Sequence, residues 1–328
     1  MRENIAYLFP GQGARYRGAA LDFLAAGSAA VRRLFEMAAD VFGRDMEALL
    51  RDSDEQAMKR TDVAQPALAL CGLASAAFLG ERGFYPAACA GFSLGEYPAL
   101  ACAGAIGAED CFRLIKARGA AMQRSADRLR AAAAGGAAPG MTAVIGLPPE
   151  KAEALIEGWR GEGGALADLY AANINSPSQL AASGTDAALL EAEARFAAAG
   201  AKCMRLRVAG PFHSPLMADS AEEFAPALEA VEFADPRIPL YSNVTGRRVE
   251  SGAEAKRLAG LQITSPVRWV DAQSALAEGG AAACFEAGPG KVLRGFWREL
   301  VRSVPCRGAG TVADVEKIIQ DEAHSEEA

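Results

Sequence analysis

The sequence predicts an α/β protein in which a large domain carries a smaller inserted subdomain. Short apolar runs alternate with amphipathic helical segments over most of the chain, as expected for a sheet covered by helices. Residues 131–140 contain only Ala, Gly and Pro, which indicates a flexible linker. Between this linker and residue 209 the expected order is β-α-β-β-α-β, the ferredoxin-like unit. We therefore expect the large domain at 1–138 and 210–328, and the inserted subdomain at 139–209.

The elements of the large domain follow from apolar runs that end at glycine or proline. Strands are expected at 4–9, 86–90, 238–242 and 282–286. The strongest helical signal is an amphipathic stretch that Ser28 can cap and Gly43 can end. Helices are expected at 28–42, 63–82, 94–103, 108–129, 292–302 and 311–322, with a frayed, charged tail at 320–328.

The inserted subdomain shows a different pattern, with short strands around two helices. A strand at 141–147 precedes a helix at 149–159 that starts with proline. A hairpin is expected from 166–175 to 179–183 across Ser-Pro-Ser, followed by a helix at 185–199 and a last strand at 202–208.

Bulk properties exclude several classes of protein. The chain has 328 residues, of which 51% are apolar, so a sizeable packed core is expected. Its net charge of −7 argues against general binding to nucleic acid or anionic membranes. It has no uninterrupted apolar run of membrane-spanning length and no signal-peptide pattern at its start. Seven scattered cysteines without a CxxC pair indicate reduced thiols in the cytoplasm and no metal site.

One serine stands in a pattern typical of a nucleophile. Gly91-Phe92-Ser93-Leu94-Gly95 has the spacing of a sharp strand-to-helix turn, in which flanking glycines allow backbones to pack closely. Such a turn exposes the hydroxyl and places the next backbone N–H at a helix N-terminus, where negative charge is stabilised. The pattern also arises by chance, so its context must decide.

A serine hydroxyl needs a base within hydrogen-bond reach, and the chain has only two histidines. His324 lies in the charged tail, whereas His213 lies at a glycine- and proline-marked loop before an expected helix start. His213 is therefore the candidate base for acyl chemistry, although a lone histidine of this kind is often structural.

Eight stretches together resemble one family, the malonyl-CoA:acyl-carrier-protein transacylases of fatty-acid synthesis and the related acyltransferase domains of polyketide synthases. The resemblance runs from residue 4 to about residue 300. In order, the stretches are PGQG (10–13), TDVAQPAL (61–68), GFSLGEYPAL (91–100), RGAAMQ (118–123), GPFHSPLM (210–217), SNVTG (242–246), QITSPVRW (262–269) and EAGPGKVL (286–293).

The resemblance implies an α/β-hydrolase-like large domain with an inserted ferredoxin-like subdomain, and a ping-pong malonyl transfer. Ser93 would attack the thioester of malonyl-CoA and His213 would take its proton. The backbone N–H groups of Leu94 and Gln12 would stabilise the oxyanion. The phosphopantetheine thiol of acyl carrier protein would then accept the malonyl group. No bound cofactor is implied, and we expect a monomer.

Gln262 matches the family position whose backbone carbonyl orients the histidine, which implies a Ser–His dyad. A triad with an aspartate such as Asp168 or Asp219 is the alternative.

Arg118 matches the family's binder of the malonyl carboxylate, since a guanidinium grips a carboxylate at two points. By the same resemblance Phe212 favours malonyl over methylmalonyl units. Met122 is expected in the pocket wall, and an ordinary core methionine is the alternative. Phe92 departs from the family, which usually has histidine before the nucleophile, so a polar contact near the acyl pocket is lost.

Docking of an acidic carrier protein would need local basic groups, because this chain is itself acidic. The alternatives to malonyl transfer are a hydrolase on the same scaffold, which would not need Arg118, and a catalytically silent subunit that binds carrier protein. The candidate docking cations are Lys116, Arg124, Arg128, Arg130, Lys202, Arg205 and Arg207.

Overall fold

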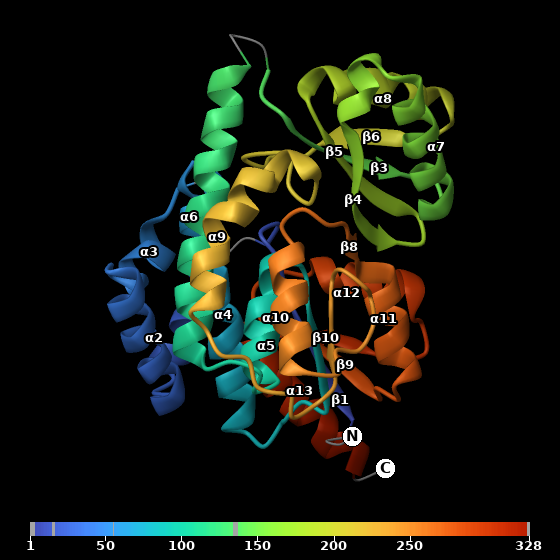
Figure 1. Cartoon of the computed structure of the whole chain (residues 1–328). Helices are drawn as coiled ribbons and strands as arrows, with labels where there is room; N and C mark the ends of the chain where they lie inside the picture. The colour runs from blue at the N-terminus through green and yellow to red at the C-terminus, as the bar shows by residue number, and fades with distance from the viewer. Residues whose placement is uncertain (1–3, 15–16, 55, 134–136, 327–328) are drawn as a thin grey trace.

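The chain folds around two five-stranded sheets. Figure 1 shows the sheet with β3–β6 at the upper right and the sheet with β1, β9 and β10 in the lower part of the molecule. The computed structural model describes residues 4–14, 17–54, 56–133 and 137–326. One sheet is wholly parallel, with the order β10-β9-β1-β2-β7. The other belongs mainly to the inserted subdomain and is largely antiparallel. The predicted α/β class is confirmed.

The parallel sheet is the centre of the large domain. Its middle strand β1 is buried at every residue, because helices cover both faces of the sheet. Four of its strands were predicted, whereas β10 was missed because its three residues include an arginine and show no apolar run. The strands are β1 (Ile5–Phe9), β2 (Ala88–Gly91), β7 (Leu240–Tyr241), β9 (Ala283–Glu286) and β10 (Cys306–Gly308).

Helices pack around this sheet, and the ends of α2 show how local capping sets a boundary. Ser28 accepts a hydrogen bond from the Val31 N–H at the start of α2, and Gly43 ends that helix at φ +67°. The helices are α1 (Leu21–Ala25), α2 (Ala29–Phe42), α3 (Met46–Asp52), α4 (Thr61–Gly80), α5 (Glu96–Cys102), α6 (Ala108–Ala132), α9 (Ala218–Glu229), α10 (Gly252–Leu261), α11 (Trp269–Glu278), α12 (Val292–Leu300) and α13 (Val312–Glu326).

Helix α4 has the length and hydropathy of a membrane span, but 78% of its apolar window is buried inside the protein. It lies against α6 and α2 in the core of the large domain. Its composition is therefore explained by packing on all sides.

The two chain segments expected to be loose are shorter than predicted. Helix α13 continues to Glu326, so the expected fraying from residue 320 is wrong for the described part, and 327–328 lie outside it. Val315 and Ile318 are buried and attach this helix to the core. The two ends of the expected linker belong to regular elements, because α6 continues to Ala132 and β3 begins at Gly140. Residues 134–136 lie outside the described part.

The inserted subdomain has the predicted β-α-β-β-α-β order, with strands arranged β6-β3-β5-β4 and its own apolar core. A fifth strand, β8 (Val267–Arg268), joins β4 in parallel from outside the insertion. The boundaries at 139 and 209 stay a prediction. The elements are β3 (Gly140–Ile145), α7 (Pro149–Glu162), β4 (Leu169–Ser176), β5 (Gln179–Gly184), α8 (Asp186–Ala198) and β6 (Lys202–Arg205).

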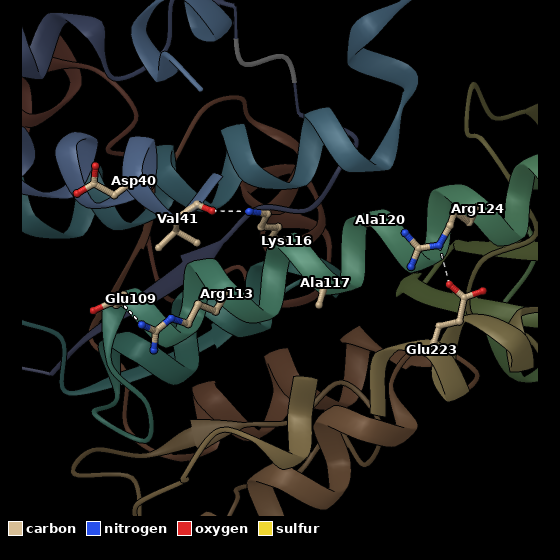
Figure 2. Close-up of a pocket in the computed structure, with 9 residues that line it drawn as sticks. All are labelled: Asp40, Val41, Glu109, Arg113, Lys116, Ala117, Ala120, Arg124 and Glu223. Carbon is tan, nitrogen blue, oxygen red and sulfur yellow. Dashed lines mark hydrogen bonds and ion pairs between the residues drawn. The ribbon is translucent and has the colours of Figure 1, made fainter. Parts of the chain in front are cut away.

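A charged groove of about 580 Å³ follows the outer face of α6, between α2 and α9 (Figure 2). Its cations are already engaged within the protein. Arg113 pairs with Glu109, Arg124 pairs with Glu223 at 2.7 Å, and Lys116 donates to the Val41 carbonyl at 2.7 Å. The groove therefore presents little uncompensated positive charge.

Candidate active site

Ser93 lies at a sharp turn between β2 and α5. Its backbone has φ +52°, a left-handed conformation that non-glycine residues rarely adopt and that costs about 1–3 kcal/mol. A Cβ on Gly91 would lie 1.9 Å from the Gly95 carbonyl oxygen, and one on Gly95 would lie 2.2 Å from that of Phe9. Both glycines are therefore required for the turn to pack against β1, as the sequence pattern predicted.

His213 faces this serine from the loop before η4 (Pro215–Met217), and its backbone also has positive φ, at +57°. Its Nε2 lies 2.8 Å from the Ser93 Oγ, and its Nδ1 lies 3.0 Å from the Gln262 carbonyl oxygen. A carbonyl oxygen can only accept, so Nδ1 carries the proton and Nε2 offers its lone pair to the serine. This is the geometry of a nucleophile and its base.

The third partner of this pair is a backbone carbonyl, not a carboxylate. The Gln262 carbonyl occupies the position where a triad would place an aspartate. Asp219 instead lies exposed on α9, where it pairs with Arg128. Asp168 ends the 3₁₀ turn before β4 in the inserted subdomain. The triad hypothesis is therefore wrong for both aspartates.

Burial, followed by the nearby positive charge of Arg118, lowers the pKa of His213 to about 4. The imidazole is consequently neutral throughout the physiological range. A neutral imidazole is the form that can accept the serine proton.

Arg118 lies beneath Ser93 and is completely buried on α6. Its Nη2 lies 3.3 Å from the Ser93 Oγ and 2.9 Å from the Gln262 Oε1, while its Nη1 lies 2.8 Å from the Gln65 Oε1. Its Nε has no hydrogen-bond partner among the described residues. Burial lowers the pKa of this guanidinium. A buried guanidinium that keeps one N–H donor without a partner beside a nucleophile suits an anionic acyl group.

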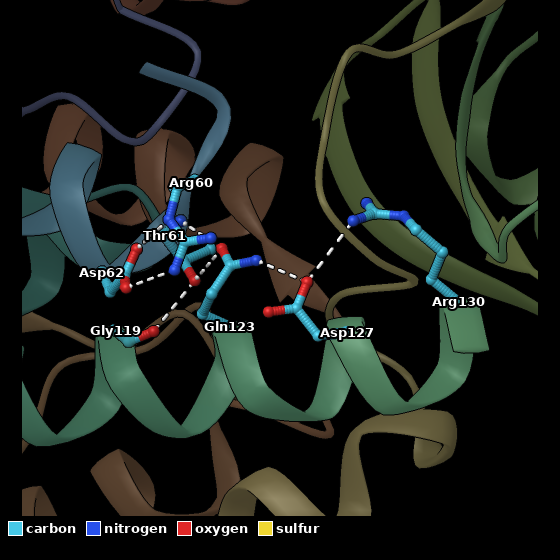
Figure 3. Close-up of polar contacts among 7 residues, drawn as sticks. All are labelled: Arg60, Thr61, Asp62, Gly119, Gln123, Asp127 and Arg130. Atoms are coloured by element: carbon cyan, nitrogen blue, oxygen red, sulfur yellow. Dashed lines mark hydrogen bonds and ion pairs between the residues drawn. The ribbon is translucent and has the colours of Figure 1, made fainter. Parts of the chain in front are cut away.

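Buried hydrogen bonds join α4 to α6 at Gly119, the residue after Arg118, and Figure 3 shows this joint. The Gln123 Oε1 accepts from the Thr61 N–H at 2.9 Å, and the Thr61 hydroxyl donates to the Gly119 carbonyl at 2.9 Å. A Cβ on Gly119 would lie 2.9 Å from the Thr61 carbonyl, so the two helices need glycine there. The joint places Gln65 on α4 opposite Arg118 on α6.

A cavity of about 700 Å³ opens onto Ser93 and His213 between the large domain and the inserted subdomain. Gln12 and Phe212 line it, whereas Arg118, Leu94 and Met122 are buried and are not among the lining residues. The expectation that Met122 forms part of the pocket wall is therefore wrong. Met122 accepts a weak hydrogen bond from the Gln65 Nε2 at 3.4 Å, so it supports Gln65. The lining residues are Pro10–Ala14, Arg17, Met58, Lys59, Phe92, Ser93, Met141, Asn173, Asn175, Gln179, Ala181, Leu206–Val208, Phe212, His213, Val292, Leu293 and Phe296.

Gln12 and Leu94 follow two adjacent parallel strands, β1 and β2, at the same edge of the sheet. A Cβ on Gly11 would lie 2.7 Å from the Phe92 carbonyl oxygen, so the Gln12 loop closely approaches the serine turn. The Gln12 side chain donates to the Lys59 carbonyl at 3.3 Å. The topology thus brings together the two backbone segments predicted to form the oxyanion hole.

Phe92 lies in an aromatic cluster at the cavity wall. Its ring meets Trp269 edge-on at a centroid distance of 5.4 Å and Phe296 at 6.4 Å. The position where the resembled family usually has histidine therefore presents an apolar surface to the cavity.

The sequence analysis did not identify several residues of the site. The Oδ1 atoms of Asn173 and Asn175 are buried without a hydrogen-bond partner in the described structure, although both residues line the cavity. They alternate along β4 and so share one face of the strand, a pattern that could have identified them. Glu96 and Asn243 are buried next to the serine turn. Both lie within stretches quoted for the family resemblance.

Most of the cations proposed for docking are held by carboxylates or carbonyls. Arg128 pairs with Glu223, Arg130 with Asp127, and Arg205 with Asp186. Arg207 instead lines the cavity, together with Arg17 and Lys59. Among the described residues, no group of three or more His, Cys, Asp or Glu side chains could hold a metal ion.

Comparison with known proteins identifies the family. Residues 6–321 match the family model described as the acyl transferase domain. The chain belongs to this acyl transferase family. Its members among the curated relatives include the malonyl CoA-acyl carrier protein transacylase of Haemophilus influenzae, which is 33% identical over 315 residues, or 95% of this chain and 96% of that protein. The enzyme of the same name from Bacillus subtilis is 33% identical over 97% of this chain and 96% of its own length.

Solved structures of the acyl transferase family confirm the two-part architecture predicted from the sequence. The acyl carrier protein S-malonyltransferase of Vibrio cholerae superposes with a TM-score of 0.87 at 32% identity, over 96% of this chain and all of that one. A malonyl-transacylase in complex with its type II PKS acyl-carrier protein gives a TM-score of 0.86 at 31% identity, over 97% of this chain and all of that one.

Proposed function

We propose that this protein transfers a malonyl group from malonyl-CoA to the phosphopantetheine thiol of an acyl carrier protein, through an ester on Ser93. The names of its relatives support this substrate pair. The observation that carries the proposal is the position of Ser93 Oγ, 2.8 Å from the base His213 and 3.3 Å from the buried cation Arg118.

In the first half-reaction, the Ser93 Oγ attacks the thioester carbonyl while His213 Nε2 removes the hydroxyl proton. The resulting oxyanion is stabilised by the backbone N–H groups of Leu94 and Gln12. In enzymes generally one such donor lowers the barrier by about 3 kcal/mol. Collapse of the intermediate breaks the C–S bond, and protonated His213 gives its proton to the departing CoA thiolate. The product is a malonyl-serine ester.

The second half-reaction runs the same steps in reverse with a new thiol. His213 takes the proton from the phosphopantetheine thiol, whose sulfur attacks the ester carbonyl. The C–O bond to Ser93 breaks, and His213 returns the proton to the serine oxygen. The thiol arrives with each substrate, so this cycle uses no resident cofactor, and its Ser–His dyad needs no carboxylate because the Gln262 carbonyl orients the imidazole.

Arg118 binds the free carboxylate of the malonyl group in this proposal. The unpartnered Nε and the Nη2 that now contacts Ser93 supply two donors for it. Gln65, supported by Met122, holds the guanidinium from the other side. Phe212 on the cavity wall limits the space beside the acyl carbon.

The amides of Asn173 and Asn175 fit the next part of both substrates. A pantetheine arm carries two amide groups, and unpartnered carboxamides on a cavity wall can hydrogen-bond such groups. We place the reaction in the cytoplasm, because all seven cysteines are free thiols, which is typical of a reducing compartment.

Intact-protein mass spectrometry tests the proposal. Malonyl-CoA should add one malonyl group to the wild-type protein, and holo acyl carrier protein should then remove it and gain the same mass. Ser93→Ala should not be labelled. A label that persists in Ser93→Ala contradicts the nucleophile assignment, and release of free malonate without labelled carrier protein would indicate a hydrolase.

A further inference from the structure

The strained backbone of Ser93 is held by a side chain from a distant loop. The Oδ1 of Asn243 accepts from the Ser93 N–H at 2.6 Å, and its Nδ2 donates to the Gly91 carbonyl at 2.6 Å. One carboxamide therefore satisfies two backbone groups that flank the nucleophile. Asn243 is completely buried, so water does not compete for these groups.

The fold brings this asparagine to the turn. Asn243 follows β7, and β7 pairs in parallel with β2, the strand that ends at Gly91. The carboxyl ends of parallel neighbours lie at the same edge of a sheet, so the two loops meet. The Ser93 N–H donates to Asn243 and is therefore not available to bind the oxyanion. That role is left to the next N–H, that of Leu94.

Glu96 connects this asparagine to the rest of the site. It is buried on α5 one turn after Ser93, and its Oε1 accepts from the Asn243 N–H at 3.2 Å. Its Oε2 accepts a short hydrogen bond from the Gln262 Nε2. Burial raises the pKa of Glu96 to about 7, while its hydrogen bonds and Arg118 oppose that rise. Arg118 and Tyr97 are the charged and titratable groups that interact electrostatically with it.

Gln262 is the second group that Glu96 positions. The Gln262 Nε2 also donates to the Ser93 carbonyl at 3.0 Å, while its Oε1 accepts from Arg118. Its backbone carbonyl accepts from His213. Ser93, His213 and Arg118 each depend on Asn243 or Gln262, and both of those contact Glu96.

We propose that Glu96 and Asn243 are positioning residues that hold Ser93 in its reactive backbone conformation and fix the orientation of the Gln262 amide toward Arg118. We call this unit the Glu96–Asn243 clamp. It touches no substrate, so it acts only through Ser93 and Gln262. This inference rests on the proposed nucleophile and extends the proposed function.

Substitution of Asn243 and substitution of Glu96 should affect the reaction differently. Asn243 controls the serine itself, so its loss slows every reaction at Ser93. Glu96 also decides which end of the Gln262 amide faces Arg118. A glutamine at position 96 can accept from only one of its two N–H partners and places its own NH₂ group against the other. The Gln262 amide then either loses its acceptor or turns its NH₂ toward Arg118.

The test compares Asn243→Ala and Glu96→Gln with wild type, using a fluorophosphonate probe and acylation by malonyl-CoA and acetyl-CoA. In Asn243→Ala we expect all three rates to fall together by about tenfold or more, as the lost support for a strained backbone predicts. In Glu96→Gln, which preserves side-chain volume, we expect malonyl transfer to fall several-fold more than acetyl transfer. Ser75→Ala is the control, because it removes a buried hydrogen bond to the carbonyl of Ala309, which follows β10 at the opposite edge of the sheet from β7.

Thermal midpoints and rates together decide the outcome. The proposal is supported if the clamp variants lose rate at a temperature where they remain folded, while Ser75→Ala loses only stability. Wild-type probe rates in Asn243→Ala, or an unchanged malonyl-to-acetyl ratio in Glu96→Gln, would overturn it. If the wild-type protein reacts with the fluorophosphonate but not with malonyl-CoA, the proposed function fails while the clamp is still tested by the probe.

Discussion

The large domain and the inserted subdomain meet at the same cavity but contribute different kinds of groups. The large domain supplies Ser93, His213 and Arg118, each fixed by hydrogen bonds within the core. The inserted subdomain supplies wall residues, among them Met141, and the amides of Asn173 and Asn175, whose Oδ1 atoms have no partner within the described part of the chain. We therefore infer that the first region performs the chemistry and the second binds the long arm of the substrates.

This difference has a physical origin in the two sheets. In the parallel sheet, β1, β2 and β7 end at one edge, so three loops from distant parts of the sequence converge there. In the antiparallel sheet neighbouring strands end at opposite edges, so fewer loops converge. That sheet instead presents one face of β4, with alternate residues toward the cavity.

The largest effect should come from adding a methyl group at the serine turn. In Gly91→Ala the new Cβ would lie 1.9 Å from the Gly95 carbonyl, so the backbone must move. We expect no detectable malonylation by mass spectrometry and a lower thermal midpoint. Gly158→Ala in α7 of the inserted subdomain is the matched control, because its Cβ would contact nothing within 4 Å. There we expect normal activity and a stability gain of about 0.5–1 kcal/mol. Normal malonylation of Gly91→Ala would remove the requirement for close packing at this turn.

A second effect should separate binding of the carboxylate from general acyl transfer. Arg118→Lys keeps the positive charge but loses the planar pair of donors. The rate of acylation by malonyl-CoA should fall about tenfold more than that by acetyl-CoA, a difference of ~1.4 kcal/mol in transition-state stabilisation. Arg113→Lys, exposed on the same helix and paired with Glu109, serves as the control. Equal losses for both substrates would mean that Arg118 supports the site without gripping the carboxylate.

The smallest effect on the reaction is expected from a residue of the inserted subdomain that lines the cavity. Asn173→Ala should raise the KM for malonyl-CoA about 3- to 10-fold and leave kcat nearly unchanged, since one hydrogen bond contributes ~0.5–1.5 kcal/mol. Steady-state kinetics at a fixed carrier concentration measure this. Ser183→Ala, another buried group without a partner in the same subdomain, should leave KM as it is because it does not line the cavity. A loss of kcat in Asn173→Ala would place chemistry in the inserted subdomain and so break the division between the two regions.

Features with a local cause could be predicted from the sequence. The serine turn depends on two glycines within five residues, and the start of α2 depends on Ser28. The order of strands and helices in the inserted subdomain also follows from local periodicity. By contrast β10 was missed, because a strand of three residues carries almost no periodic signal. The expected frayed tail was wrong because α13 continues to Glu326, and Glu322, beyond residue 320, is buried.

By itself the sequence determined which residues were available for acyl chemistry. These are Ser93 in a sharp turn, His213 in a loop outside the charged tail, and Arg118 within a helix. Only the tertiary structure decided how they are connected. The family resemblance implied that the Gln262 carbonyl is the partner of His213, but residue types alone could not predict it, because every residue has a backbone carbonyl. Asn243 reaches the Ser93 N–H across 150 residues because β2 and β7 lie side by side. Such contacts come from strand order, which local sequence does not encode.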